Sequence, residues 1–386
     1  MIEYKGTIVY IGGFEMPDKN AAAHRVLNNS KIFSELGYKI VFCGIDHTIP
    51  RNVKEPIVFD NFESYPFKYP NSTKDWIKSQ IKFSDYEIIL NKYCDIKFVI
   101  GYNMHAIPLR SLETWCKKNK IKLLLDVTEW YPNKFSLKPK NLIRWIDVNL
   151  SMRIYQKKAD GMISISSFLY NYYKKYIENI IVIPPLIDIS ELKWNEKKIN
   201  RGKSIEFTYS GRAGNSKDMI KDKIDIIINA MSNIPEEYDF HFSVVGMDSN
   251  ECISLFPNIK NQLLMLGDKV TFYGKVSHKR SLQILNDSDY CIFLRDTNRQ
   301  NMAGFPTKFV ECVTIGNGLI VNDFSDIKKY FPINNFILLE EISSKLITET
   351  IISCIKNGKI EKNQKSIFDY RNYIGILNLF LNKMEK

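Results

Sequence analysis

Cationic side chains gather in one short segment of the sequence, YSGRAGNSKDMIKDKID (209–225). Arg212 follows an apolar run, and Lys217 and Lys221 precede the helical pattern IDIIINAM. A guanidinium fork and an ammonium beside a strand end can clamp a diphosphate leaving group and neutralise its developing charge. The segment therefore predicts a phosphate site, although a solvated basic loop is the more common origin of such a pattern.

A second phosphate-binding pattern occurs later, in RDTNRQNMAGFPTKFVEC (295–312). A helix is predicted to begin at its Gly-Phe-Pro-Thr sequence (304–307), and helix N-termini present free backbone N–H groups to phosphate or sugar oxygens. Glu311 lies one turn into this helix, where a carboxylate can accept both hydroxyls of a ribose. The alternative is that Glu311 only interacts favourably with the helix dipole.

A glycine-containing loop follows the first apolar run, in GGFEMPDKNAAAHR (12–25). Gly12 and Gly13 would let the backbone approach a phosphate, and the next helix is predicted to begin near Asn20. The loop lacks the G-x-G-x-x-G fingerprint, so a NAD-dependent dehydrogenase is disfavoured. A tight turn is the simpler explanation of these glycines.

These loops are predicted to lie at strand ends, because short apolar runs alternate with helical patterns along the chain. Such runs are typical of strands buried on both faces of parallel sheets. They occupy 7–12, 39–44, 96–102, 122–127, 161–166 and 180–185, and then 205–211, 240–246, 270–274, 290–295, 318–323 and 335–340. We therefore expect an α/β fold with two Rossmann-like domains facing each other across a cleft. Their predicted bounds are 1–190 and 191–365, followed by a C-terminal helix, 366–386, that crosses back to the first domain.

The composition disfavours several classes of protein. With 386 residues, 45% hydrophobic and 25% charged, the chain can form two folded domains. Its seven cysteines form no C-x-x-C pair, which argues against a disulfide framework or a zinc site. There is no run of 18 apolar residues, and the first residues lack a secretory-signal pattern, so a cytoplasmic protein is expected.

Basic residues are concentrated in the first half of the chain, where residues 1–190 hold 27 Lys and Arg against 19 Asp and Glu. This excess suggests a polyanionic partner or, equally, a lysine-rich solvated surface. Two complete α/β domains exceed what a nucleic-acid-binding module requires, so no nucleic-acid partner is expected.

Seven segments together resemble family-4 glycosyltransferases, especially those that assemble bacterial capsules, O-antigens and exopolysaccharides. They are GG…P…AAAHR near the start, DVTEWY (126–131), KKADGMISIS (157–166), IPPLID (183–188), YSGRAG…KDKID, VTFYGKV (270–276) and NRQNMAGFPTKFVE (298–311). Each segment alone is unspecific, but they follow the family's order over nearly the whole chain. The resemblance implies a GT-B fold, a nucleotide-sugar donor bound mainly by the C-terminal domain and an acceptor bound by the N-terminal domain. It also implies transfer with retention of anomeric configuration and without a bound metal, and it favours UDP over GDP as the nucleotide.

Within this resemblance, Arg212 matches the donor-phosphate arginine; Lys221 is the better match for its lysine partner, whereas Lys217 has the commoner spacing. Glu311 matches the second acid of the Glu-x7-Glu motif, which usually contacts ribose. The first acid is replaced by Ala303, and Asn301, Arg299 and Arg295 are candidates to substitute for it. The predicted donor-binding residues are Gly13, Arg212, Lys217, Lys221, Val276, Arg295, Arg299, Asn301, Gly304, Phe305, Pro306, Thr307 and Glu311.

The implied mechanism uses the leaving diphosphate to accept the acceptor's proton, while Arg212 and Lys221 supply the charge that a divalent cation supplies in other transferases. No Asp-x-Asp metal motif occurs in a suitable loop, and no metal is predicted. Glu129 is a candidate catalytic residue that holds the acceptor hydroxyl or acts as a base, with a buried, paired acid as the alternative. His105 is a minor candidate, because a lone histidine is more often structural. The predicted acceptor-binding residues are Asp18, Asn20, His24, Glu129 and Trp130.

The expected acceptor is a glycan or an undecaprenyl-diphosphate-linked glycan. The segment 133–158 mixes basic residues, such as Lys138 and Arg144, with aromatic and aliphatic ones. This mixture suits docking at an anionic inner membrane leaflet, which would make the protein peripheral there. For the helix itself, the favoured interpretation is that its apolar face packs on the sheet and its lysines lie in solvent.

Two other functions are compatible with the sequence. One is a nucleotide-sugar epimerase of the GT-B fold, which would show pairs of carboxylates and histidines. The other is a non-catalytic, nucleotide-sugar-binding partner subunit, which the substitution at Ala303 suggests.

Overall fold

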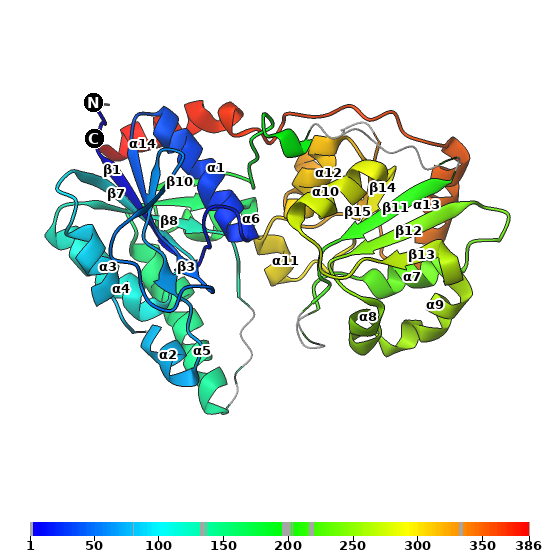
Figure 1. Ribbon diagram of the computed structural model, residues 1–386, viewed down its shortest axis with the longest axis horizontal. Coiled ribbons are helices and arrows are strands. Elements are labelled where there is room, and N and C mark those ends of the chain that lie inside the picture. The colour runs from blue at the N-terminus through cyan, green and yellow to red at the C-terminus, as the bar shows by residue number, and fades with distance from the viewer. Residues whose placement is uncertain are drawn as a thin grey trace. The chain divides into compact units, whose positions relative to one another are not determined.

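The computed structural model describes residues 3–79, 81–131, 135, 137–194, 202, 204–214, 216, 220–331 and 335–385. Contacts within the chain divide it into two compact units (Figure 1). Unit 1 comprises Met1–Asp188, Ala303–Phe305 and Phe368–Lys386. Unit 2 comprises Ile189–Met302 and Pro306–Ile367.

Unit 1 contains an eight-stranded sheet in the order β10-β9-β8-β7-β1-β2-β5-β4, parallel except for the pair of β4 and β5. All six residues of β1 are buried, as expected of a strand that is covered on both faces. The strands are β1 (Thr7–Gly12), β2 (Lys39–Cys43), β4 (Ile57–Phe59), β5 (Phe62–Ser64), β7 (Ile96–Tyr102), β8 (Lys122–Val127), β9 (Gly161–Ser164) and β10 (Asn179–Val182); β3 (Ile45–Asp46) and β6 (Phe67–Lys68) form a separate pair.

The helices of unit 1 come from both ends of the chain. The last helix, α14, inserts Leu377 and Phe380 into the same hydrophobic core as Ile8 and Phe33, so this core needs the C-terminal segment. The helices are α1 (Ala21–Glu35), α2 (Thr73–Ser79), α3 (Ser84–Leu90), α4 (Ala106–Lys118), α5 (Pro139–Leu150), α6 (Ser167–Tyr173) and α14 (Ile374–Glu385), with shorter turns η1 (Ser151–Tyr155), η2 (Gln156–Lys158) and η8 (Tyr370–Tyr373).

Unit 2 contains a six-stranded, fully parallel sheet in the order β13-β12-β11-β14-β15-β16. If β11 is counted as strand 1, the order is 3-2-1-4-5-6, which is that of a Rossmann fold. The strand order reverses between β11 and β14. The strands are β11 (Ile205–Ser210), β12 (Phe240–Val245), β13 (Val270–Phe272), β14 (Tyr290–Ile292), β15 (Gly318–Asn322) and β16 (Phe336–Leu339). The helices are α7 (Ile224–Ser232), α8 (Ser249–Leu255), α9 (Lys260–Leu266), α10 (His278–Asp287), α11 (Arg299–Ala303), α12 (Thr307–Ile315) and α13 (Ser344–Asn357), with short helical turns η3 (Leu192–Trp194), η5 (Pro257–Ile259), η6 (Gly267–Lys269) and η7 (Ile327–Tyr330).

The predicted α/β class is confirmed, because each predicted apolar run overlaps a strand of one of the two sheets. Several runs extend beyond their strands. For example, β14 ends at Ile292, whereas the predicted run 290–295 continues for three more residues. The strands β3, β4, β5 and β6, of two or three residues each, were not predicted, because so short a segment shows no periodicity.

Within the segment 133–158, whose helix was predicted to pack its apolar face on the sheet, α5 does not fit this prediction, although Ser151, Met152 and Gln156 in the turns that follow it are buried. None of the twelve residues of α5 is buried, so this helix does not cover the sheet with its apolar face. It contacts α4 and the following turn η1 instead, which leaves much of its surface in solvent. In the described part of the chain, no helix has the length and apolar character that crossing a membrane requires.

Candidate functional site

The carboxyl ends of the unit 2 strands bear several of the residues predicted to bind the donor, among them Arg212 and Lys221. Gly211 follows β11 with a φ of +129°, and a Cβ there would lie 2.9 Å from Lys308 Nζ. Gly246 follows β12 with a φ of +102°, and a Cβ there would lie 2.8 Å from the carbonyl oxygen of Gly211. Glycine therefore allows these backbone segments to pass close together at the edge where open α/β sheets bind ligands.

Arg212 extends from this edge, and its side chain is 52% exposed. Its Nη2 lies 3.1 Å from Oε1 of Glu251, which also belongs to the capping box of α8. Because this ion pair is exposed, it holds the guanidinium only weakly, and a phosphate could replace Glu251.

Lys221 lies at the base of the loop that Arg212 begins. Its backbone N–H donates to Ala213 at 2.7 Å, and Gly214 bridges Ile220, so both ends of the loop are tied together. Lys221 is half-buried. The second predicted lysine, Lys217, falls outside the described residues.

Helix α12 begins at Thr307, and the side chain of its N-cap, Pro306, makes no capping hydrogen bond. The Phe309 N–H donates to the Pro306 carbonyl at 3.1 Å, whereas the N–H groups of Thr307 and Lys308 can meet an anion. Glu311 follows one turn later, half-buried, with Oε1 3.0 Å from Nε2 of His278. His278, the first residue of α10, was not predicted; its only sequence signal was its place after the VTFYGKV segment.

Beneath this edge lies a buried group of charges. The carboxylate of Asp222 is fully buried and accepts hydrogen bonds from Lys308 Nζ (2.5 Å), from the Tyr209 hydroxyl (2.6 Å) and from Arg295 Nε. Burial alone would raise the pKa of Asp222, but Lys308 and Arg295 hold it well below its usual range. Burial lowers the pKa of Lys308, and Asp222 offsets this only in part.

Neither Asp222 nor Lys308 was singled out from the sequence. The signal that could have found Lys308 is its place in the apolar pattern FPTKFV, since a lysine within a buried pattern requires a partner.

The remaining predicted donor residues have varied surroundings. Asn301 is buried and its Nδ2 donates to the Asp296 carbonyl at 2.9 Å, whereas Arg299 is exposed at the start of α11. Val276 is half-buried in the loop before α10. Gly304 and Phe305 belong to unit 1, where Phe305 packs on Phe368 with ring centroids 6.1 Å apart.

In unit 1, the loop after β1 holds three predicted site residues, Gly13, Asp18 and Asn20, and α1 holds a fourth, His24. A Cβ on Gly12 would lie 2.3 Å from the Tyr102 carbonyl oxygen, so close packing explains that glycine, whereas Gly13 has open space around it. The side chain of Asn20 caps α1 by accepting from the Ala23 N–H at 2.8 Å. Asp18 and His24 form an ion pair of 2.7 Å between Oδ1 and Nε2.

The segment after β8 is anchored by its buried first residue, Asp126. This carboxylate accepts from the Tyr10 hydroxyl at 2.5 Å, from Arg25 Nε at 2.8 Å and from Asn29 Nδ2 at 3.2 Å. Arg25 Nη2 also lies 2.7 Å from Oδ1 as an ion pair, without the angle of a hydrogen bond. The segments AAAHR and DVTEWY therefore meet in the structure through Arg25 and Asp126.

Glu129 and Trp130 follow at the carboxyl end of β8. Glu129 is half-buried, and its carboxylate has no hydrogen bond or ion pair to any other described residue. The Trp130 ring is 7% exposed and packs edge-on against Tyr172 at 4.8 Å, with Arg153 5.8 Å from its centroid. Thus Glu129 has the freedom that an acceptor contact requires, whereas Trp130 is part of the packing.

His105 precedes α4 and interacts with α5. Its Nδ1 lies 2.8 Å from Oδ2 of Asp147, while Oδ1 of the same carboxylate accepts from the Ala106 N–H at 2.7 Å. Asp147 thereby satisfies one of the free N–H groups of α4 and orients the imidazole.

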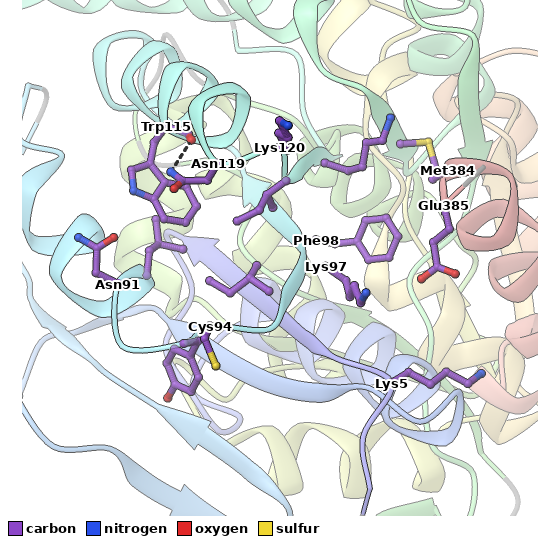
Figure 2. A pocket seen from close by; sticks show the side chains of 15 residues that line it. Lys5, Asn91, Cys94, Lys97, Phe98, Trp115, Asn119, Lys120, Met384 and Glu385 are labelled. Carbon is purple, nitrogen blue, oxygen red and sulfur yellow. Dashed lines mark hydrogen bonds between the residues drawn. The ribbon is translucent and has the colours of Figure 1, made fainter.

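A separate cavity of about 900 Å³ opens at the opposite, amino-terminal edge of the unit 1 sheet (Figure 2). Lys5, Lys97 and Lys120 lie around it, together with Phe98 and Trp115. None of the predicted site residues lines this cavity.

Two Rossmann-like units in one chain define a protein of the GT-B fold, and solved structures of that fold resemble this chain over nearly its whole length. Sucrose-phosphate synthase from Thermosynechococcus elongatus matches with a TM-score of 0.70 at 13% identity, over 98% of this chain and 99% of that chain. Anabaena Alr3699/HepE, solved in complex with UDP, matches with a TM-score of 0.63 at 15% identity, over 98% and 100%. UDP-GlcNAc 2-epimerase from Methanocaldococcus jannaschii matches with a TM-score of 0.57 at 12% identity, over 97% and 99%.

No protein-family model and no curated protein sequence matches the chain. At identities of 12–15% these structural matches establish the fold and nothing further. Function has to be argued from the residues of the site.

Proposed function

We propose that this protein is a retaining, metal-independent glycosyltransferase. It moves a hexose from a nucleoside-diphosphate sugar, UDP- in preference to GDP-, to a glycan or undecaprenyl-diphosphate-linked acceptor in surface-polysaccharide synthesis. One observation carries the proposal: the carboxyl edge of the unit 2 sheet combines Arg212, the N–H groups of Thr307 and Lys308 at the start of α12, and the half-buried carboxylate of Glu311. These are a cation, backbone donors at a helix N-terminus and a double acceptor, the groups that a diphosphate and a ribose require.

In this proposal unit 2 binds the donor. Arg212 and Lys221 neutralise the charge that develops on the leaving diphosphate, and the N–H groups of α12 bind its oxygens. Glu311, held by His278, accepts the ribose hydroxyls. Because the diphosphate itself takes the proton from the acceptor, no protein nucleophile is needed, and the sugar is transferred with retention.

Unit 1 binds the acceptor. Glu129 orients the attacking hydroxyl, because its carboxylate lies at the carboxyl end of β8 and is half-exposed. The pair of Asp18 and His24 and the N-cap Asn20 contribute polar groups at the end of β1, and His105 is a lesser candidate at the end of β7.

The HepE neighbour was solved with UDP and also with UDP-glucose, which supports a uridine nucleotide as the first donor to test. The neighbour that is an epimerase, together with the His278–Glu311 pair, favours epimerisation as the second candidate function. A non-catalytic nucleotide-sugar-binding subunit is the third.

A single experiment separates these functions. The protein is incubated with EDTA and with UDP-glucose, UDP-galactose, UDP-GlcNAc or GDP-mannose, and proton NMR follows the sugar. A retaining transferase slowly hydrolyses one donor in the absence of acceptor and releases the α-anomer first. Conversion of the intact donor to a sugar epimer indicates an epimerase, and binding without any reaction indicates the non-catalytic subunit; either result contradicts the proposal.

The lipid-linked acceptor also requires access to a membrane, and the surface formed by α2, α5 and residues 135, 137 and 138 (the α2–α5 surface) supports this. It exposes large apolar side chains: Phe135 is 61%, Leu137 79% and Ile146 44% exposed. The two helices meet where Lys140 Nζ lies 5.5 Å from the Trp76 ring centroid. In the sequence of α2, of α5 and of residues 135–138 there are five basic residues and two acidic residues. Exposed apolar side chains among cations complement an anionic lipid surface.

We therefore expect the protein to sediment with phosphatidylglycerol-containing vesicles and not with phosphatidylcholine vesicles. Reversing two charges, Lys140→Glu with Arg144→Glu, should weaken this binding at least about tenfold, because each basic residue near the surface contributes about 1 kcal/mol. The control is Leu264→Ser on α9, which removes an apolar side chain outside the α2–α5 surface. Leu264 is 74% exposed, close to the 79% of Leu137. Equal binding to both kinds of vesicle, or no effect of the reversal, would contradict the membrane part of the proposal.

A further inference from the structure

The buried charges of Asp222, Arg295 and Lys308, here called the Asp222 cluster, do not balance. Two cations share one carboxylate, since Lys308 Nζ and Arg295 Nε both donate to Asp222. The third donor, the Tyr209 hydroxyl, is neutral, and burial raises its pKa well above the ordinary value. The cluster therefore carries one surplus positive charge, and a buried surplus of this kind is costly unless an anion meets it.

The surplus lies at the place where this type of sheet binds ligands. Arg295 follows β14, and Asp222 forms an antiparallel bridge with it from the loop that follows β11. The sheet order reverses between β11 and β14, which is the switch point of an open α/β sheet. Asn322, at the end of β15, fixes the Arg295 backbone by accepting from its N–H at 2.9 Å and donating to its carbonyl at 2.8 Å.

The described residues make hydrogen bonds to one edge of the Arg295 guanidinium, and the Phe324 ring centroid lies 5.4 Å from its Cζ. Nε donates to Asp222, whereas neither Nη nitrogen has a hydrogen-bond partner within the described ranges. The side chain keeps 14% of its surface exposed. The neighbouring acid, Asp296, is paired with Lys223 at 2.8 Å. A guanidinium held by Nε keeps two Nη nitrogens that can bind a carboxylate or a phosphate.

We infer that the two Nη nitrogens of Arg295 bind an oxyanion of the donor, with the Asp222 cluster as their rigid support. The oxyanion is either the phosphate that carries the sugar or a carboxylate on the sugar itself, as in a uronic acid. This inference rests on the proposed function and deepens it, because it names a charge that the donor must carry at this subsite.

The test is isothermal titration calorimetry with four probes: UDP, UDP-glucose, UDP-glucuronic acid and inorganic diphosphate. Arg295→Gln should weaken binding by about 10- to 100-fold, the range for losing a hydrogen bond to a charged group. Asp222 stays paired with Lys308 and Tyr209 in this variant, so the fold should persist, and a melting curve checks it. Arg295→Lys, which keeps the charge and loses the fork, should show an intermediate loss. Arg110→Gln, an exposed arginine on α4, is the matched control.

The four probes distinguish the two sources of the oxyanion. A similar loss for all four identifies the phosphate, and a loss confined to UDP-glucuronic acid identifies a sugar carboxylate. Unchanged binding of all probes by Arg295→Gln and Arg295→Lys would overturn the inference and leave the proposed function standing. If the wild-type protein binds none of the four, the inference and the uridine-nucleotide donor are both wrong.

Discussion

Replacing Asp126 with alanine is expected to lower the free energy of unfolding of unit 1 by about 3–5 kcal/mol, because it leaves a buried cation unpaired. Arg25 is 3% exposed, and its other contacts are two carbonyl oxygens, of Ile183 at 2.9 Å and Pro184 at 3.2 Å. These dipoles cannot compensate a full charge. Tyr10 and Asn29 would lose an acceptor as well. Urea unfolding, followed by circular dichroism, gives the change in free energy from the shift in midpoint.

Two controls separate lost pairing from general damage. Glu55→Ala removes an exposed carboxylate (88% exposed) and should change the free energy by less than about 0.5 kcal/mol. The double substitution Arg25→Met with Asp126→Leu removes both charges and should cost less than Asp126→Ala alone. If Asp126→Ala costs under about 1 kcal/mol, the pair of Arg25 and Asp126 does not hold α1 to the sheet as described.

Replacing Arg212 with alanine is expected to lower the turnover of the nucleotide sugar by about 10²–10³-fold, the usual effect of losing one group that stabilises developing charge. The loss should fall mainly on kcat, because the charge on the diphosphate grows as the glycosidic bond breaks. Arg212→Lys should recover part of the rate, since it keeps the charge and loses the fork. Donor hydrolysis, followed by NMR at several donor concentrations, measures kcat and KM.

The partner of Arg212 supplies the matched control. Glu251→Gln removes the exposed carboxylate that pairs with Arg212 and leaves the guanidinium in place. We expect turnover within about twofold of wild type, because an exposed ion pair contributes under about 1 kcal/mol. Equal losses in Arg212→Ala and Glu251→Gln would mean that the loop geometry matters and that Arg212 does not touch the donor.

Much of the fold could be predicted from local patterns. A run such as TIVYIG is apolar on both faces, so it predicts a strand within a parallel sheet, and β1 occupies those six residues. The positions of Arg212 and Glu311 at the sheet edge could also be predicted locally, because Arg212 comes just after strand β11 and Glu311 lies near the start of helix α12. Helix α5 was harder, because an amphipathic pattern marks an apolar face but does not say what covers it.

The ion pairs could not be predicted in the same way. Arg25 and Asp126 are 101 residues apart, and Lys308 and Asp222 are 86 apart, so no local pattern links them. What the sequence does contain is a charge inside an apolar run, as in KLLLDV, and such a charge requires a partner. Which partner it has is decided by the sheet order. For this reason the pairing of His278 with Glu311 and of Lys308 with Asp222 was found only in the structure.

The measurement that tests the central claim most directly is a thermal-shift screen of the protein in EDTA against UDP, GDP, ADP, CMP and NAD, repeated with Glu311→Ala. A ligand that binds only the folded state stabilises it by about 2.7 kcal/mol at a hundredfold excess over its Kd. We predict that one nucleoside diphosphate, UDP in preference to GDP, raises the Tm of the wild type and does not raise the Tm of Glu311→Ala. A response to NAD alone, or no response from a folded protein, would contradict the nucleotide-sugar site and with it the transferase proposal.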